Sequence, residues 1–315
     1  MTKTSGVLAL KSGDVVEIRR LSEIEATLDS AGNLEGVPFM PEMQPYCGRV
    51  FRVHKRADKV CVETPYFLHY RRLKDTVMLE EIRCDGSAHD GCQRLCLVFW
   101  KEAWLKPAAA GAVPEPAIDW TRKSLRSELT PVDEEKTYFC QSTALLGATE
   151  FLRLWDPRQY LRDLRSGAIG LFDLLKVLLI IVVNHVRRAR GRYEWNAFLG
   201  KSPKTPSVTL GLQQGDEVRV KGAQEVIATL DPQGRNRGLY FGVEMNRHCG
   251  TTLQVITPVD RMILETSGKM KALKNTVLLK GTECSGICNH GCARAGHPLW
   301  REAWLERTQP PTQTQ

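Results

Sequence analysis

The chain has 315 residues, of which 42% are hydrophobic and 25% are charged, and its formal net charge is +8. This balance excludes an intrinsically disordered chain, and the length is sufficient for two domains of ordinary size. The positive charge permits an anionic partner, such as nucleic acid, a phosphorylated ligand or an acidic membrane surface, but does not require one.

The N-terminal stretch MTKTSGVLALKSGD has no long apolar core after its first lysine. It lacks the pattern of a secretory signal, so we expect a cytoplasmic protein whose ten cysteines are reduced. In a reducing compartment, clustered cysteines are more often metal ligands or catalytic groups than disulfides.

The chain contains an internal duplication. GDVVEIRR from Gly13 matches GDEVRVKG from Gly215, and GVPFMPEM at 36–43 matches GLYFGVEM at 238–245, both at an offset of 202. After a slip of two residues, FWKEAWL at 99–105 matches LWREAWL at 299–305. We therefore divide the chain into three parts. These are module one (10–106), a connector made of a hinge and helices (107–208) and module two (209–308).

Each module has the pattern of short strands separated by turns. DVVEIRRL and DEVRVKG alternate apolar and polar residues, and SAGN and DPQG follow as turns at equivalent places. The predicted fold class is mainly β with an α connector, in which two small antiparallel barrels are joined by a helical segment. The order of glycines, strands and an aromatic residue in the first 45 or so residues of each module resembles barrels of the Tudor or KOW kind. The paired tryptophans of FWKEAWL and LWREAWL are expected to pack in the cores, in a short turn or strand that caps each barrel.

The connector is predicted to begin with a hinge at 107–118 and to continue as helices. In WDPRQYLRDLRSG, Asp156 is placed as the N-cap, Pro157 as the first helical residue and Gly167 as the end. The next apolar run, Leu171 to Val186, is too short and too charged to be a confident membrane span.

Three environments are open for this second helix. Its apolar residues occupy nearly all faces from Val177 to Val183, which favours burial between the modules. Alternatively, 168–192 makes peripheral membrane contact, with the arginines at its end meeting anionic headgroups. A protein partner is the third possibility.

Cysteines recur at equivalent places in both modules. Three pairs are related by the duplication: Cys47 and Cys249, Cys84 and Cys284, and Cys92 and Cys292. Gly86, Gly91 and Arg94 recur as Gly286, Gly291 and Arg294, and the glycines are typical of a tight loop that turns both of its cysteines inward.

These thiols predict a metal site in each module. A structural zinc site is closed by four ligands, usually thiolates with or without histidine. The predicted ligands are Cys47, Cys84, Cys92 and Cys96 in module one, and Cys249, Cys284, Cys288 and Cys292 in module two, with His89, His290 and His297 as alternatives. Zinc, at two ions per chain, is the first choice of cofactor and an iron–sulfur cluster the second. Disulfides and inert buried thiols remain open as well.

Two cysteines fall outside these sets. Cys61 has basic neighbours that would favour a reactive thiolate, although a strand cysteine that points into the core is the commoner case. Cys140 could join either site or pack within the connector. No Walker loop, GxGxxG, HExxH or Ser-His-Asp pattern is present in the sequence.

The segments CDGSAHDGCQRLCLVFWKEAWL and WDPRQYLRDLRSG resemble a bacterial family of chains of about this length. Some members accompany genes for polysaccharide or natural-product biosynthesis, and the resemblance implies no particular activity. Module two departs from the motif, with CSGICNHGCARAGH, so the two modules need not have equal functions.

We therefore expect a metal-stabilised binding or scaffold protein in a biosynthetic or regulatory assembly. The first alternative is a redox protein or metalloenzyme with an iron–sulfur cluster or an open metal position near Cys47, Cys84, His89 and Cys92. The second is nucleic-acid binding through basic residues of module one: Arg49, Arg52, Lys55, Arg56, Arg71 and Arg72.

Overall fold

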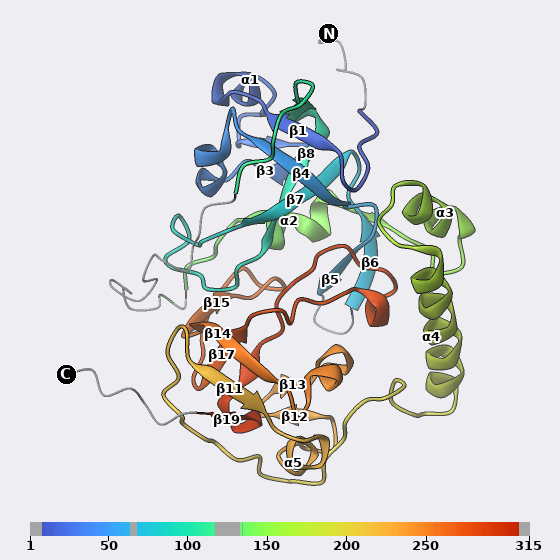
Figure 1. The fold of residues 1–315 in the computed structure, drawn as a ribbon, viewed down its shortest axis with the longest axis vertical. Helices are drawn as coiled ribbons and strands as arrows, with labels where there is room; N and C mark the ends of the chain where they lie inside the picture. Colours follow the sequence, from blue (N-terminus) through green and yellow to red (C-terminus); the bar gives the residue numbers. More distant parts are fainter. Residues whose placement is uncertain (1–7, 64–67, 117–132, 134, 309–315) are drawn as a thin grey trace, which may run out of the picture.

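We analysed a computed structural model of the chain and describe residues 8–63, 68–116, 133 and 135–308 (Figure 1). Residues 117 and 118 of the predicted hinge lie outside this range. The two ends of the described chain have the same succession of elements, and a helical segment around residues 141–189 separates them.

Module one is built on a five-stranded antiparallel sheet. Its strands, in spatial order, are β8 (Leu97–Lys101), β7 (Thr76–Arg83), β4 (Val50–Arg56), β1 (Val15–Ile18) and β9 (Leu105–Pro107). The turn η2 (Glu102–Trp104) directs the chain from β8 back to β1, where Ile18 pairs with Leu105. The helix α1 (Leu21–Glu25), the β2 (Asn33–Leu34)–β3 (Val37–Pro38) hairpin and the 3-10 helix η1 (Pro41–Tyr46) fill the interval between β1 and β4.

Module two repeats this plan. Its sheet has the order β18 (Trp300–Arg301), β17 (Thr276–Leu279), β14 (Thr252–Pro258), β11 (Glu217–Val220) and β19 (Leu305–Arg307). The smaller elements are α5 (Ala223–Ala228), β12 (Arg235–Asn236), β13 (Leu239–Tyr240), η4 (Val243–His248), η5 (Ile287–Asn289) and η6 (Glu302–Trp304). The fold is therefore mixed α/β and strand-rich, with two five-stranded antiparallel sheets, one of them a half-barrel.

The tryptophans are buried in the cores, as the sequence predicts. Trp100 and Trp104 are 0% exposed in module one, and Trp300 and Trp304 are 0% exposed in module two. The indole N–H of Trp104 donates to Thr27 Oγ1 over 3.0 Å, and that of Trp304 donates to Thr229 Oγ1 over 3.1 Å. The rings of Trp104 and Trp304 thus contribute their apolar area to the cores while their polar atoms keep partners, whereas the indole nitrogen of Trp100 is buried without one.

Each module sends a hairpin to the other. In module one the hairpin is β5 (Val60–Glu63)–β6 (Leu68–Arg72), and in module two it is β15 (Arg261–Ile263)–β16 (Met270–Ala272). Ala293 N donates to Lys59 O of the first hairpin, and Gln93 N donates to Arg261 O of the second. Figure 1 shows β5 and β6 reaching down to the red loops of module two. We name residues 84–96 loop one and residues 284–296 loop two.

The loops also exchange apolar side chains. Leu95 of loop one is buried with Val259 and Leu278 of module two, and Ala293 of loop two is buried in the core of module one. The modules therefore hold each other directly, through two loops and two hairpins related by the duplication.

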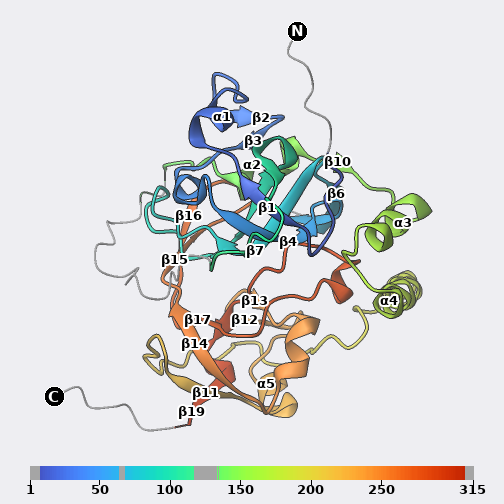
Figure 2. The same ribbon diagram turned by 45° about the horizontal axis from the view of Figure 1, so that its top comes forward.

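Of the connector helices, α3 (Pro157–Arg165) and α4 (Leu171–Ala189) lie along one side of the molecule, whereas α2 (Gln141–Ala148) lies within module one (Figures 1 and 2). In α2, buried Gln141 bonds both the N–H and the carbonyl of Phe99, which fixes the helix at the β8 edge. The prediction for α3 (Pro157–Arg165) is confirmed, because the Asp156 carboxylate accepts from Arg158 N and Pro157 is the first helical residue. The strand β10 (Glu150–Phe151) extends the β5–β6 hairpin.

The second helix is only partly buried, although its sequence favours burial between the modules. In α4 (Leu171–Ala189) only one face is covered, by way of Leu174, Val177, Ile180 and Ile181, while Phe172 is 79% and Leu179 64% exposed. Apolar side chains therefore extend beyond the buried face of α4 onto its exposed face. Among the described residues, no helix is long and apolar enough to cross a membrane.

Candidate metal centre

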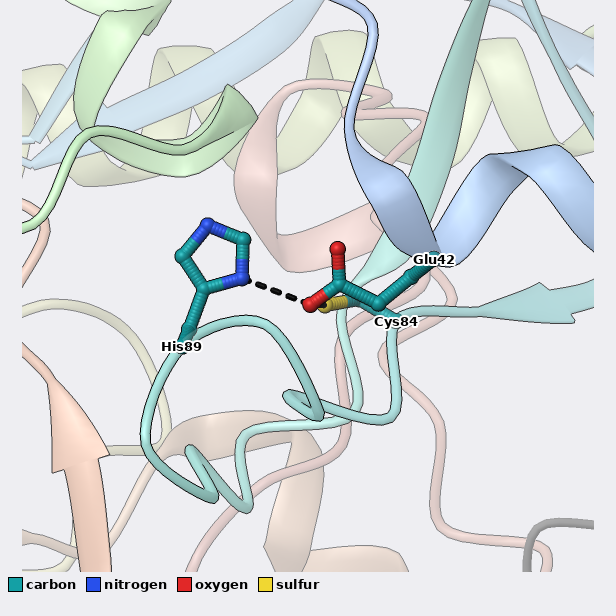
Figure 3. A group of neighbouring side chains, drawn as sticks. All are labelled: Glu42, Cys84 and His89. Atoms are coloured by element: carbon teal, nitrogen blue, oxygen red, sulfur yellow. Dashed lines mark hydrogen bonds and ion pairs between the residues drawn. The ribbon is translucent and has the colours of Figure 1, made fainter.

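Three side chains of module one form a compact group of metal-binding type. The ligand atoms of Glu42, Cys84 and His89 all lie within 4.8 Å of one another, and no other such group of three occurs among the described residues. His89 Nδ1 lies 2.6 Å from Glu42 Oε1, and Cys84 Sγ lies 3.7 Å from the same oxygen. Figure 3 shows the imidazole facing the carboxylate, with the sulfur beside it.

The backbone of loop one brings these groups together. Gly86 has a φ of +69°, and a Cβ at this position would lie 2.1 Å from Cys92 O. His89 N and Gly91 N both donate to Gly86 O, so the loop is a tight coil that returns the chain to its start. Glu42 comes from η1, and Ala88 N donates to its Oε1 over 3.1 Å, which ties the coil to the 3-10 helix.

The Glu42 carboxylate is the least hydrated member of the group. Its side chain is 0% exposed, and Oε2 is buried without a hydrogen-bond partner. A buried carboxylate oxygen without a partner is costly, so its presence points to a cation that completes the site. Thiolate, imidazole and carboxylate are all established zinc donors.

The charges of the group are coupled. Burial would raise the pKa of Glu42, but the hydrogen bond and charge of His89 outweigh it and hold this pKa below its ordinary value. Burial would lower the pKa of His89, and Glu42 raises it instead. Burial first, and the Glu42 charge second, raise the pKa of Cys84. A bound cation would therefore have to displace protons from Cys84 and His89.

A cavity of about 40 Å³ adjoins the group. Four thiols and one imidazole line it, together with the guanidinium groups of Arg94 and Arg294. Burial raises the pKa of Cys92 to about 11, so this thiol is protonated at neutral pH without a metal. The five ligand-type residues on its wall are Cys84, His89, Cys92, Cys96 and Cys140.

The predicted four-cysteine set of module one is thus only partly gathered. Cys84, Cys92 and Cys96 share the cavity, and Cys140 joins them from the start of α2. Cys47 does not, because it caps the far end of η1 and packs against the apolar core. His89, predicted as an alternative ligand, belongs to the compact group.

Loop two has the same backbone but a different set of contacts. Glu244, the counterpart of Glu42, accepts from Ser285 N and Cys288 N. Asn289 stands where loop one has His89, and its Nδ2 donates to Cys284 Sγ over 3.3 Å. The expected second quartet is not gathered: Cys249 packs in the module-two core, and Cys292 faces module one.

The two histidines predicted as alternative ligands in module two have other surroundings. The ring of His290 stacks on Tyr70 with centroids 3.9 Å apart, and burial lowers its pKa to about 4. His297 is 3% exposed, and burial lowers its pKa to about 3. The group of Glu42, Cys84 and His89 is the possible three-residue metal site among the described residues.

Cys61 lies in β5 against Cys292 of loop two. The two Sγ atoms are 3.1 Å apart, and Cys61 N donates to Cys292 Sγ over 3.1 Å. At the equivalent contact between β15 and loop one, Ile263 N donates to Cys92 Sγ over 3.4 Å. Of these two contacts between a hairpin and a loop, only the one between Cys61 and Cys292 has a pair of thiols. The hydrogen bond with Cys292 and burial raise the pKa of Cys61. Burial would also raise that of Cys292, but hydrogen bonds and Arg294 lower it overall.

The basic residues proposed for nucleic-acid binding are largely engaged inside the protein. Arg56 is buried and pairs with Asp58 and Glu102. Four others have protein partners: Arg49 with Glu115, Arg52 with Glu80, Arg71 with Thr149, and Arg72 with Asp58. These contacts reduce the positive charge that module one could offer to phosphates.

Glu42 is the candidate ligand that the sequence prediction missed. A signal for it exists in the duplication, because Glu42 recurs as Glu244 within the matched segments GVPFMPEM and GLYFGVEM. The cysteine and histidine pattern does not include this carboxylate, which lies 42 residues before Cys84 and offers no spacing motif.

No family model, curated protein or solved structure matches this chain in comparisons with known proteins.

Proposed function

We propose that the protein is a metal-stabilised scaffold in which Glu42, Cys84 and His89 hold one zinc ion. The buried, unpartnered Glu42 Oε2 inside a thiol–imidazole–carboxylate group is the observation that carries this proposal. Zinc prefers four donors in a tetrahedron, and three protein donors leave one position, which the adjoining cavity can supply with a thiol or water.

The position of the group in the fold supports a scaffold role. Loop one contributes Cys84 and His89, and the same loop binds the β15–β16 hairpin of module two through Gln93. An ion that stiffens loop one would therefore stabilise the contact between the modules as well as module one. The strand order, in which a fifth strand returns past a 3-10 turn to the first, supports the Tudor- or KOW-like character of each module. The resemblance to a family that accompanies biosynthesis genes supports a place in a biosynthetic or regulatory assembly.

The duplication provides matched controls for the test. Elemental analysis of the purified protein should find one zinc per chain, and Glu42→Gln and Cys84→Ser should each lose it. Glu244→Gln and Cys284→Ser remove the counterpart residues of module two and should keep it. Glu42→Gln preserves the size of the side chain, so a folded Glu42→Gln protein that retains its zinc contradicts the proposal.

One observation favours a second candidate. Cys84, Cys92, Cys96 and Cys140 all line a single cavity, and thiolates around a cavity are the usual holders of an iron–sulfur cluster. Protein purified without oxygen would then be brown and contain iron and sulfide. Cys140→Ser distinguishes the candidates, because it should abolish a cluster but leave zinc at Glu42, Cys84 and His89 in place.

A further inference from the structure

Exposed apolar side chains of this protein are concentrated on the connector. Of the fourteen large hydrophobic side chains that are exposed in the described part of the chain, eleven lie between residues 151 and 195. Monomeric globular proteins rarely expose such a contiguous apolar surface without a use for it. The exposed apolar side chains thus belong mainly to one segment of the chain and are not spread over the whole surface.

The outer face of α4 carries a continuous apolar stripe. Its spacing of three and four residues places the side chains on one side of the helix, opposite the buried face. The exposed members are Leu171, Phe172, Leu175, Leu179, Val182 and Val186.

Two exposed tryptophans lie beside the C-terminal half of α4. Trp155 is 62% exposed, and its ring meets that of His185 at 5.7 Å between centroids. Trp195 is 52% exposed, and its backbone N–H donates to Asn184 Oδ1 over 2.7 Å. Tryptophan is the residue that prefers the boundary between lipid and water.

Positive charge is concentrated on the same segment. Residues 151–195 contain nine arginines and lysines but four acidic residues, a net charge of +5 in a chain whose total is +8. Asp163 is buried against Lys59, and Asp173 pairs with Lys176 at the start of α4. Four arginines at or beyond the end of the helix have no acidic residue among them: Arg187, Arg188, Arg190 and Arg192.

We infer that the outer face of α4, flanked by Trp155 and Trp195, docks on the surface of an anionic lipid bilayer. An apolar stripe beside a basic cluster fits the acyl boundary and the charged headgroups together. A second copy of the chain would bring two strongly positive segments together, which is unfavourable. A nucleic acid would match the arginines but leave the apolar stripe exposed. The helix lies along the membrane plane in this arrangement, which agrees with its inability to span a bilayer.

Vesicle sedimentation tests this inference. Full-length protein should sediment with vesicles of phosphatidylcholine and phosphatidylglycerol at a ratio of about three to one, and much less with phosphatidylcholine alone. Binding should weaken as salt is added, because the charges are exposed and screened.

Variants on the two halves of the face separate the contributions. The double variant Phe172→Ser with Leu179→Ser should bind the vesicles at least about tenfold more weakly than the parent, since two exposed apolar side chains are removed. Arg190→Gln with Arg192→Gln should lose about fivefold for each charge and much of the salt dependence. Val113→Ser, at a 77% exposed position in the hinge and far from α4 in sequence, is the control and should bind as the parent does. All of these positions are exposed, so the thermal midpoints should agree.

Three results would overturn the inference. The first is no sedimentation of the parent protein with anionic vesicles at low salt. The second is unchanged binding by the Phe172 and Leu179 double variant. The third is a stable dimer in lipid-free buffer that this double variant converts to a monomer, which would assign the face to a second copy of the chain. None of these results depends on whether the protein holds zinc, so they are separate from the metal proposal.

Discussion

Loop one and loop two have the same backbone conformation but carry different side chains. Gly86 and Gly286 have φ angles of +69° and +82°, and a Cβ on either would lie 2.1 Å from the carbonyl oxygen of Cys92 or Cys292. In both loops the residue at position 89 or 289 donates its N–H to that glycine. Loop one has His89 beside a buried carboxylate, whereas loop two has Asn289. The comparison separates the residues that fold the loop from the residues that give it a chemical role.

The shared backbone should give the largest effect. Gly86→Ala and Gly286→Ala should each lower the free energy of unfolding by about 4 kcal/mol, because the new Cβ meets a backbone carbonyl in a left-handed conformation. Gly13→Ala is the control: its φ is +92°, but nothing lies within 4 Å of the added carbon, so a loss of about 1 kcal/mol is expected. Urea unfolding measures all three. A loss in only one loop would show that the loops are not equivalent in structure.

Removal of the metal should distinguish the loops. At a free zinc concentration of about a hundred times the Kd, the ion should add about 3 kcal/mol to the free energy of unfolding. Chelation should therefore lower the thermal midpoint of the parent and of Cys284→Ser. The Cys84→Ser protein should not respond to chelation, and a response equal to that of the parent would exclude Cys84 as a ligand.

Oxidation should affect the contact between Cys61 of module one and Cys292 of loop two. One equivalent of hydrogen peroxide would take two electrons and two protons from Cys61 and Cys292, leaving a disulfide and two waters. This crosslink between the modules should add about 2 kcal/mol to stability. Peptide mapping under non-reducing conditions detects it.

The duplication again supplies controls for this prediction. Cys61→Ile copies the residue found at Ile263 and should remove the crosslink. Ile263→Cys should allow a second one, with Cys92. If Cys61 and Cys292 are both alkylated as readily after peroxide treatment as before, the two thiols do not act as a pair.

Acid should destabilise module two through His297, the residue that follows loop two. His297 is buried, and its pKa is lowered from an ordinary value of 6.5 to about 3, so between these values the unfolded chain binds the extra proton. The free energy of unfolding should therefore fall as the pH falls below about 6.5, by at most about 1.4 kcal/mol per pH unit for this residue. His297→Gln should flatten the slope, and His185→Gln, at an exposed position of α4, should not. A slope that is identical in both variants would count against this assignment.

Local features were predictable from the sequence. The cap at Asp156, the buried tryptophans and the tight glycine loops depend on residues close in the chain or on the repeat itself. The exchange of loops was not predictable, because Cys61 meets Cys292 and Gln93 meets Arg261 only after both modules have folded. The ligand set depends on the same kind of distant contact, since η1 brings Glu42 to a loop that begins 42 residues later.

The environment of α4 could not be decided from its composition either. Its apolar residues favour burial over membrane contact, and only the packed structure shows that one side alone is covered. The sequence pattern shows which residues of the helix are apolar, and the fold determines which of them are covered by the rest of the protein.

Metal content after exchanging the residues at positions 89 and 289 tests the central claim most directly. His89→Asn gives loop one the residue of loop two and should abolish zinc binding, while Asn289→His beside Glu244 and Cys284 should add a second, weaker ion. Elemental analysis of the folded variants after dialysis measures both. A His89→Asn protein that still contains one zinc per chain would contradict the account.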